Sequence, residues 1–430
     1  MLDIRFVREN PDIVKRDLLK RNEPEKVKLV DELVSSDAEW RKLKQEADDL
    51  RHKRNVVTLE ISELKKQGKD TGEKLREAKE LPDKIKDAEA KLEELRDRVE
   101  LILMQLPNIL HDSVPVGKDS TENAEIRRWG KITQFDFELK PHGELIEELG
   151  LADFKSATKV SGAGFVYLKN ELALLDISLQ RFAIDFLMKK GFNLIEPPLM
   201  LRRKPYEGVV SLDDFEKVMY KIEGEESYLI ATSEHPLVAM HMDAAFEEKE
   251  LPVKYCGISP CFRREIGSHG VDTRGLFRMH QFNKVEQVIF CKPEESWQLH
   301  EEIQKNSEEM LQKLEIPYRV VSICTGDIGP IAAKKYDIEA WFPREKEYKE
   351  VTSASNCTSY QAVRLNIKFK KIENGKEARE YVHTLNNTGI ATSRTMRAII
   401  ENYQNEDGSI SVPKVLVQYM NGIKKIGKGK

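Results

Sequence analysis

The chain has 430 residues, of which 40% are hydrophobic and 33% are charged. This length allows two domains with cores of ordinary size. The formal net charge of -4 excludes no class of partner, because basic residues can gather locally even in a slightly acidic chain. The N-terminus lacks the apolar core of a signal peptide, and no apolar run is long enough to span a bilayer. We therefore expect a cytoplasmic protein with no membrane partner.

A heptad pattern dominates the first quarter of the chain. Apolar residues recur at steps of three and four over 40–64, interrupted at Arg54, and again over 78–106. The segment between them, 65–72, holds two glycines and no apolar residue. Two such seams joined by a short turn predict an antiparallel α-helical coiled-coil arm. Pro82 lies early in the second seam and predicts either a kink or a later start of that helix.

Basic residues gather along the outer half and the tip of this arm. They are Arg51, Lys53, Arg54, Lys65, Lys66 and Lys69. A protruding basic hairpin could lie along a phosphate backbone, which favours binding to a structured RNA. Acidic residues are also abundant in the arm, so a coiled coil that joins two subunits remains an alternative. Because Pro107 ends the second seam, we place an N-terminal domain at 1–112 and a larger domain at 113–430.

The larger domain mixes helices with short strands. The segment 172–190 predicts a helix, and 191–198 predicts a turn and a strand that ends in two prolines. Further strands are predicted at 228–231, 253–258, 276–291, 319–323 and 348–352, and a further helix at 297–314. The strands are joined mostly by loops and not by regular strand–helix–strand units. They therefore predict an α+β domain with an antiparallel sheet.

Five cysteines lie in this domain, at Cys256, Cys261, Cys291, Cys324 and Cys357. No two have CxxC spacing and no histidine pair accompanies them, which predicts reduced, mostly buried thiols. A metal-binding role for Cys261 or Cys357 is the alternative.

Two long strands over 255–290, joined by the loop 267–275, carry charged and aromatic side chains in alternation. Because side chains alternate between the faces of a strand, one face should hold Arg263 and Glu265 on the first strand and Arg278, Phe282 and Glu286 on the second. Arginine grips phosphate and an aromatic ring can stack on a purine. A solvent-facing strand with ordinary ion pairs would explain any one of these residues, but it explains the set poorly.

A second arginine, Arg394, follows the small, apolar run 389–393, which predicts a packed turn that leads into a helix. Arg394 and Arg397 on a solvated helix face are the alternative. Glu350 and Ser353 could bind Mg²⁺ through hard oxygen atoms. Their odd spacing requires a bulge or a strand end to bring them to one side, and a solvated strand end is the simpler interpretation. The chain has no P-loop and no GxGxxG sequence, so the two arginines indicate a polyanion site without a glycine-rich loop.

Three segments, taken in order, resemble the three motifs of class II aminoacyl-tRNA synthetases: 191–198, 262–286 and 389–394. Within that class, nearly the whole chain resembles the seryl-tRNA synthetase family. This closer resemblance rests on the basic arm and on the segments 106–108, 127–130, 232–234, 272–276 and 401–404. The segment 232–234 by itself could equally cap a helix.

The resemblance implies a serine–tRNA ligase that uses ATP to form seryl-adenylate and then charges tRNA(Ser), and tRNA(Sec) where an organism has it. It implies a homodimer formed through the first motif, with ATP and Mg²⁺ as cofactors. Arg263 would hold the α-phosphate and the serine carboxylate, and Arg394 would hold the γ-phosphate end. Phe282 would stack on adenine. Arg264 stands where many members have a smaller residue, and we expect it to face away from Arg263.

The resemblance also implies the composition of each site. L-serine would bind at Thr232, Ser233, Glu234, Arg263, Glu286 and Thr388. ATP would bind at Arg263, Arg264, Glu265, Arg278, Met279, Phe282, Glu350, Val351, Thr352, Ser353 and Arg394, and Mg²⁺ would bind with ATP at Glu350 and Ser353. A divergent seryl family selects serine with zinc, but the basic arm and the lack of a Cys/His set lead us to expect no zinc.

Two other functions remain open. A non-catalytic RNA-binding or scaffolding relative would have lost Arg263, Glu286 or Arg394, yet all three are present. A class II ligase for another amino acid or for a carrier protein is opposed by the basic arm.

Overall fold

The computed structural model describes residues 1–211, 218–265, 275–373 and 375–427. The chain forms two compact units, Met1–Pro107 and Asn108–Lys430. The boundary that we predicted after residue 112 stays a prediction. Within the described ranges, no helix combines the length and the apolarity that a membrane crossing requires.

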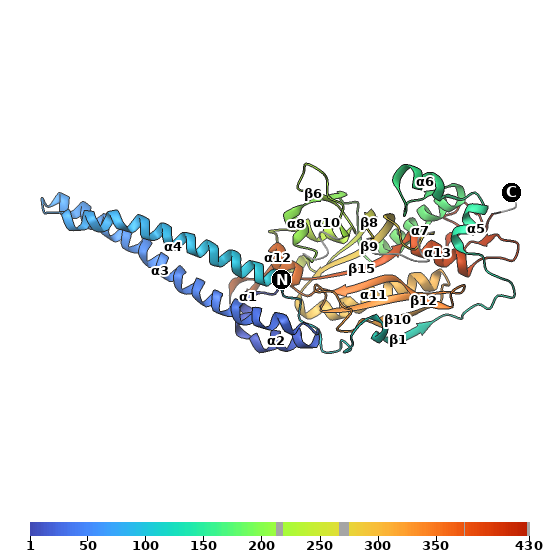
Figure 1. The fold of residues 1–430 in the computed structure, drawn as a ribbon, viewed down its shortest axis with the longest axis horizontal. Coiled ribbons are helices and arrows are strands. Elements are labelled where there is room, and N and C mark those ends of the chain that lie inside the picture. Colours follow the sequence, from blue (N-terminus) through green and yellow to red (C-terminus); the bar gives the residue numbers. More distant parts are fainter. Residues whose placement is uncertain (212–217, 266–274, 374, 428–430) are drawn as a thin grey trace. The chain divides into compact units, whose positions relative to one another are not determined.

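The first unit is a helical hairpin with two short helices at its base. Its helices are α1 (Ile4–Glu9), α2 (Pro11–Lys20), α3 (Val27–Lys66) and α4 (Gly72–Gln105). The long helices α3 and α4 run side by side in Figure 1 and pack along their length. Their seam buries Ala47 and Val57 from α3 against Leu81, Ile85 and Ala88 from α4. The predicted antiparallel arm is therefore confirmed.

The start of the second arm helix differs from one of our two expectations for Pro82. Helix α4 begins at Gly72 and contains Pro82 in its interior, so a late start at the proline is wrong. A proline inside a helix removes one backbone hydrogen bond. Leu81 beside it is only 3% exposed, and packing of this kind supplies most of a helix's stability in a protein.

An eight-stranded sheet forms the centre of the second unit, and all its neighbouring strands are antiparallel except β4 and β8. In spatial order its strands are β1 (Ala124–Trp129), β10 (Tyr318–Ser322), β11 (Lys334–Phe342), β12 (Glu347–Asn356), β15 (His383–Ala391), β9 (Gln281–Cys291), β8 (Val253–Phe262) and β4 (Asn193–Ile195). This sheet with its helices confirms the predicted α+β class.

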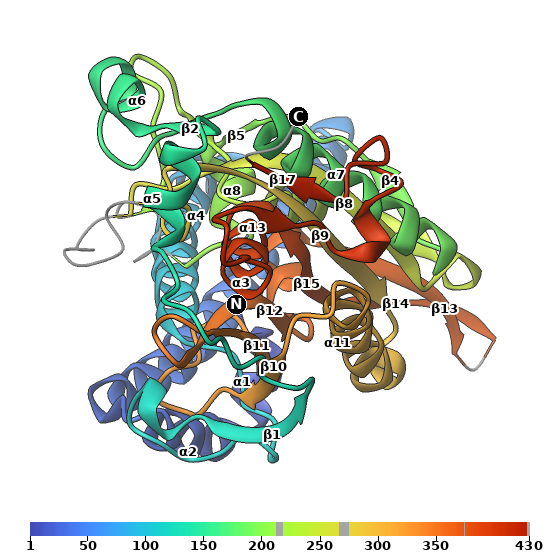
Figure 2. The same ribbon diagram turned by 90° about the vertical axis from the view of Figure 1, so that its right-hand side faces the viewer.

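Helices cover the sheet and form the main core with it. The longest are α7 (Asn170–Lys189), α11 (Ser296–Lys313) and α13 (Thr392–Asn402), which pack on β9, β12 and β15 and lie beside these strands in Figure 2. The shorter helices are α5 (His142–Glu148), α6 (Phe154–Ser161), α8 (Arg203–Glu207), α10 (Glu234–Ala239) and α12 (Tyr360–Leu365). All five cysteines are free and buried, as predicted.

Four small sheets complete the part of this unit that the structure describes. One pairs β14 (Lys376–Tyr381), β13 (Lys368–Glu373) and β7 (Ala245–Glu247). The others pair β2 (Ala152–Asp153) with β3 (Tyr167–Leu168), β5 (Met200–Arg202) with β6 (Ser227–Leu229), and β16 (Ile410–Ser411) with β17 (Lys425–Ile426).

The strands around the two arginines are shorter than the alternation of residues predicted. Strand β8 ends at Phe262, and Glu265 has a φ of 44°, a left-handed conformation that stops extended pairing. Strand β9 begins only at Gln281, because the N–H of His280 donates to Gly164 instead of to β8. Glu265 and Arg278 therefore do not share strand faces as predicted. Most of the loop that we predicted over 267–275 lies outside the described residues.

The run before Arg394 is also different from our prediction. Residues up to Ala391 form the end of strand β15, and helix α13 begins directly at Thr392. Gly389 lies at a bulge between the pairs Thr388–Glu286 and Ile390–Val285. A Cβ atom at Gly389 would lie 3.2 Å from the Val285 carbonyl oxygen. The small residue is thus required by close strand packing and not by a turn.

Candidate active site

A cavity of about 450 Å³ opens over the sheet where β9, β12 and β15 meet helix α13. Its lining brings together many of the predicted residues, which lie far apart in the sequence: Thr232, Glu234, Arg263, Phe282, Glu286, Glu350, Val351, Ser353, Thr388 and Arg394. A cavity of this size suits a small-molecule substrate, and a few converging polar groups in it can fix an orientation.

Arg263 lies just beyond the end of β8 and is held from two sides. Its Nε–H donates to the carbonyl oxygen of Ala231 at 3.3 Å, and its guanidinium carbon lies 5.3 Å from the centre of the Phe282 ring. The backbone N–H of Arg263 donates to His280, which ties the two strands together. These contacts orient the side chain while its outer donors remain available to a ligand in the cavity.

Arg394 comes from the first turn of α13 and pairs with Glu350. Its Nη1 donates to the backbone oxygen of Glu350 at 3.1 Å and to the Oε1 atom at 3.0 Å. In the pairing of β11 with β12, Glu350 lies opposite Glu339 and Thr352 lies opposite Ile338, so Val351 is an extra residue. Of the two possibilities that the odd spacing of Glu350 and Ser353 allowed, a bulge or a strand end, the structure has the bulge, and both residues line the cavity.

Besides Arg394 and Glu350, the cavity contains a group of buried polar side chains around Glu286. Thr388 on β15 lies directly across from Glu286 on β9, and its hydroxyl donates to Glu286 Oε2 at 3.3 Å. Lys284 forms an ion pair with the same carboxylate oxygen at 2.5 Å. The N–H of Glu234 donates to the Thr232 hydroxyl oxygen at 3.2 Å. This region could hold a small ligand that has both an ammonium and a hydroxyl group.

Family models match both units of the chain. A seryl-tRNA synthetase N-terminal domain matches residues 1–110, and a class II tRNA synthetase core domain for the G, H, P, S and T enzymes matches residues 217–403. A serine–tRNA ligase from Methanoregula boonei is 61% identical over 98% of this chain and 99% of its own length. The chain belongs to the seryl-tRNA synthetase family.

Solved structures agree with this assignment to the seryl-tRNA synthetase family. The crystal structure of seryl-tRNA synthetase from Pyrococcus horikoshii complexed with ATP has a TM-score of 0.93, with 50% identity over 100% of both chains. A serine–tRNA ligase from Naegleria fowleri in complex with AMP has a TM-score of 0.88 and 34% identity, over 100% of this chain and 99% of its own.

Some residues of this chain that we predicted for the serine and ATP sites lie outside the cavity lining. Among the described residues, the cavity lining does not include Ser233, Arg264, Glu265, Arg278, Met279 or Thr352. Ser233 instead packs on Gly257 of β8, where a Cβ atom would lie 2.8 Å from its hydroxyl. Arg264 and Arg278 are exposed. Met279 lines a smaller neighbouring cavity of about 130 Å³ that also contacts the Phe282 ring.

Sequence reasoning missed other polar residues of the cavity. Lys284 lies on β9 midway between Phe282 and Glu286, and the strand alternation that united those two residues could have found it. Lys335 lines the cavity from β11 and pairs with Asp337 at 3.2 Å. No local pattern marked Lys335, because its strand reaches the cavity only through the pairing of β11 with β12.

Two carboxylates of the cavity have opposite pKa shifts. Burial, together with the nearby Glu286 charge, raises the pKa of Glu234 to about 7, and a hydrogen bond from Gln361 only partly offsets this. Burial would also raise the pKa of Glu350, but Arg394, Lys335 and Arg263 together hold it below its usual value. Glu234 therefore ionises at a higher pH than an ordinary glutamate, whereas Glu350 stays ionised as the partner of these cations.

The raised pKa of Glu234 predicts that the free energy of unfolding decreases as pH rises. Between the ordinary glutamate pKa of 4.5 and about 7, the folded protein binds more protons than the unfolded chain, so stability falls as pH rises through this window. At pH 8, the variant Glu234→Gln should be more stable than the parent by roughly 2–3 kcal/mol, and the difference should shrink towards about pH 5. Urea unfolding at both pH values measures it.

Glu350→Gln is the matched control, because its carboxylate lies in the same cavity with the opposite shift. This variant should be less stable than the parent at pH 8, since an ion pair with Arg394 is removed. If both variants changed stability in the same direction, our account of the Glu234 charge would be wrong.

Proposed function

We propose that this chain is a serine–tRNA ligase. It activates L-serine with ATP to form seryl-adenylate and diphosphate, and then transfers the seryl group to the terminal ribose of tRNA(Ser), or of tRNA(Sec) where an organism has it. The observation that carries the proposal is a single cavity that contains both Arg263 and Arg394 together with the polar residues around Glu286. Relatives with the same fold bind ATP and AMP in their solved structures.

The chemistry is a displacement at phosphorus, in which a serine carboxylate oxygen attacks the α-phosphate and diphosphate leaves. Arg263 contacts both reacting groups, so it offsets their repulsion and holds the attack in line. Phe282 stacks on the adenine ring, and Met279 borders the same ring from the smaller cavity. Arg394 binds the far phosphates, where negative charge grows as diphosphate departs.

Glu350 and Ser353 fit a magnesium ion that arrives with ATP. Both offer oxygen atoms, the bulge at Val351 brings them to the cavity, and Mg²⁺ prefers one or two protein ligands completed by phosphate and water. Such an ion would neutralise phosphate charge during the displacement.

Serine is selected by the buried polar groups around Glu286. Glu286 is 1% exposed, accepts a hydrogen bond from Thr388 and forms an ion pair with Lys284. Together with Thr232 and Glu234 it binds the serine ammonium and hydroxyl groups. Alanine would leave these groups unpaired, and a site built for a hydroxyl rejects such an analogue strongly.

The two domains divide the work. We assign tRNA binding to 1–112 and catalysis to 113–430. Of the basic residues on the arm, Arg51 and Lys53 form ion pairs with Glu89 and Glu77. Arg54, Lys65, Lys66 and Lys69 lie exposed on the outer half and the tip, where they contact the tRNA backbone.

A second copy of the chain completes the cytoplasmic enzyme as a homodimer. Leu194 on β4, within the first motif, is 44% exposed, and Ile177 and Met188 on the preceding helix α7 are 60% and 51% exposed. Exposed apolar groups of this kind mark interaction surfaces.

The test is ATP–pyrophosphate exchange with each of the twenty amino acids, followed by charging of tRNA(Ser). Serine alone should stimulate exchange. Stimulation by another amino acid would establish a different class II ligase, and no exchange with any of them would establish a non-catalytic relative. Either result would overturn the proposal.

A further inference from the structure

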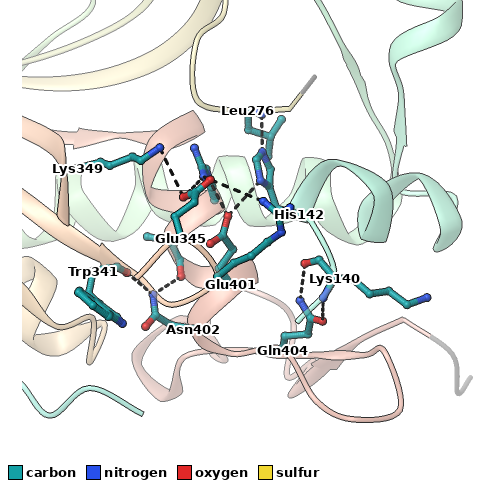
Figure 3. Close-up of polar contacts among 12 residues, drawn as sticks. Lys140, His142, Leu276, Trp341, Glu345, Lys349, Glu401, Asn402 and Gln404 are labelled. Atoms are coloured by element: carbon teal, nitrogen blue, oxygen red, sulfur yellow. Dashed lines mark hydrogen bonds and ion pairs between the residues drawn. The ribbon is translucent and has the colours of Figure 1, made fainter. Parts of the chain in front are cut away.

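A largely buried charge cluster lies outside the cavity lining, and the proposed reaction does not use it. This Glu401 cluster consists of His142, Glu345, Arg397 and Glu401, and Figure 3 labels its members His142, Glu345 and Glu401. Arg397 is 1% exposed, and it donates to Glu401 at 2.9 Å and to Glu345 at 2.5 Å. Arg397 is therefore not on a solvated helix face, one of the interpretations that its sequence allowed.

His142, the first residue of α5, connects this cluster to the backbone within the second motif. Its Nδ1 lies 3.2 Å from Glu401 Oε1, and its Nε2 lies 3.0 Å from the N–H of Leu276 (Figure 3). Since a backbone N–H can only donate, Nε2 is the acceptor, and the proton is on Nδ1. The imidazole thus bridges the Glu401 carboxylate on α13 and the backbone N–H of Leu276, which is 134 residues after His142 in the chain.

Gly275, next to Leu276, packs directly against the His142 ring. Gly275 has a φ of +143°, and a Cβ atom there would lie 2.2 Å from His142 Nε2. Any other residue would push the backbone away from the imidazole. The position of the Leu276 N–H is therefore set by direct contact with His142.

Phe277, the next residue, forms a surface on which Arg394 rests. The guanidinium carbons of Arg394 and Arg397 lie 5.0 Å and 4.9 Å from the centre of its ring, and the Phe342 ring meets it edge-on at 5.8 Å. Among the described residues, two side chains orient Arg394: Phe277 through a cation–π contact and Glu350 through a hydrogen bond. If Glu350 binds a magnesium ion when ATP arrives and releases Arg394, the contact with the Phe277 ring remains to orient Arg394.

We propose that His142 is a positioning residue for ATP: by holding the Leu276 N–H, it fixes Phe277, and through Phe277 it orients Arg394 towards the far phosphates. This inference rests on the proposed function for the identity of the nucleotide. His142 lies outside the cavity lining, so it acts through other residues.

Three variants test the role by isothermal titration calorimetry with magnesium and ATP, in the absence of serine and tRNA. His142→Asn keeps a donor for Glu401 but loses the acceptor for Leu276. It should weaken ATP binding about tenfold, the effect of one buried hydrogen bond. His142→Gln returns an acceptor near the former Nε2 position and should restore most of the affinity. In an Arg394→Ala background, His142→Asn should have no further effect, because it acts through Arg394.

Tyr403→Phe is the control for stability alone. It removes one hydrogen bond, from the Tyr403 hydroxyl to the Leu314 carbonyl at 2.7 Å, close to Glu401 but away from Phe277. Its melting temperature should fall while its ATP affinity stays at the parental value. In pyrophosphate exchange, His142→Asn should raise KM for ATP and leave KM for serine unchanged.

Four results would overturn the inference: unchanged ATP affinity in His142→Asn, equal weakening in His142→Gln, additivity with Arg394→Ala, or a parent that binds no ATP. A parent that binds ATP but shows no serine-dependent exchange would refute the proposed function. It would leave the titration of the variants as a valid test of His142.

Discussion

Replacing Arg263 by alanine should lower the rate of serine-dependent pyrophosphate exchange by about a thousandfold, the scale of removing one preorganised transition-state interaction in a closed site. The reason is that, in the proposed mechanism, the Arg263 guanidinium faces two anions that must approach each other. Arg263→Lys should recover only part of the rate, because an ammonium cannot donate to both groups in a fixed plane. Single-turnover formation of seryl-adenylate measures the step directly.

Arg379→Ala is the matched control. Arg379 lies on β14, pairs at the surface with Glu377, and is outside the cavity lining. It should exchange pyrophosphate at the parental rate. An Arg263→Ala variant that kept most of the parental rate while remaining folded would show that the attack is oriented by other groups, with Lys284 as the next cation to test.

Shortening the arm should strongly reduce tRNA charging and leave adenylate formation intact. Arg51 and Glu89 form an ion pair across the hairpin at 2.9 Å, so a short glycine-rich turn can join them in place of residues 52–88. The base of the arm keeps its buried residues Val30, Leu33 and Ile102. Without the outer half to bind phosphates, kcat/KM for tRNA should fall by about a hundredfold or more at physiological salt, as measured by charging and by pyrophosphate exchange on the same preparation.

A charge variant separates the basic residues from the shape of the arm. Changing Arg54, Lys65, Lys66 and Lys69 to glutamine should weaken tRNA binding and flatten its logarithmic dependence on salt by about 0.7–0.9 for each phosphate that is no longer neutralised. Changing Lys370, Lys371, Lys376 and Arg379 on the three-stranded sheet alters the net charge equally and should have little effect. Undiminished charging with the shortened arm would contradict the assignment of tRNA binding to 1–112.

Local patterns were enough to predict much of this molecule. The arm could be predicted because a heptad seam depends on spacing within each helix, and Ala47, Val57 and Ile85 are buried as that spacing requires. The α+β class followed from strand lengths and connecting loops. The period of a strand, with the assumption that Glu350 and Ser353 act together, predicted either a bulge or a strand end between them, and the structure has a bulge, at Val351. The type of ligase came from the resemblance of several segments to one family.

The tertiary structure alone decided where strands stop and which charges meet. Glu265 leaves the extended conformation, and the N–H groups of Leu276 and His280, on either side of Arg278, donate to His142 and Gly164 and not to strand β8. Lys335 reaches the cavity, and His142 reaches Leu276, through the packing of separate elements. The physical reason is that hydrophobic periodicity reports only which face of an element is buried. The partners of a polar group depend on distances between elements, which packing sets after each has formed.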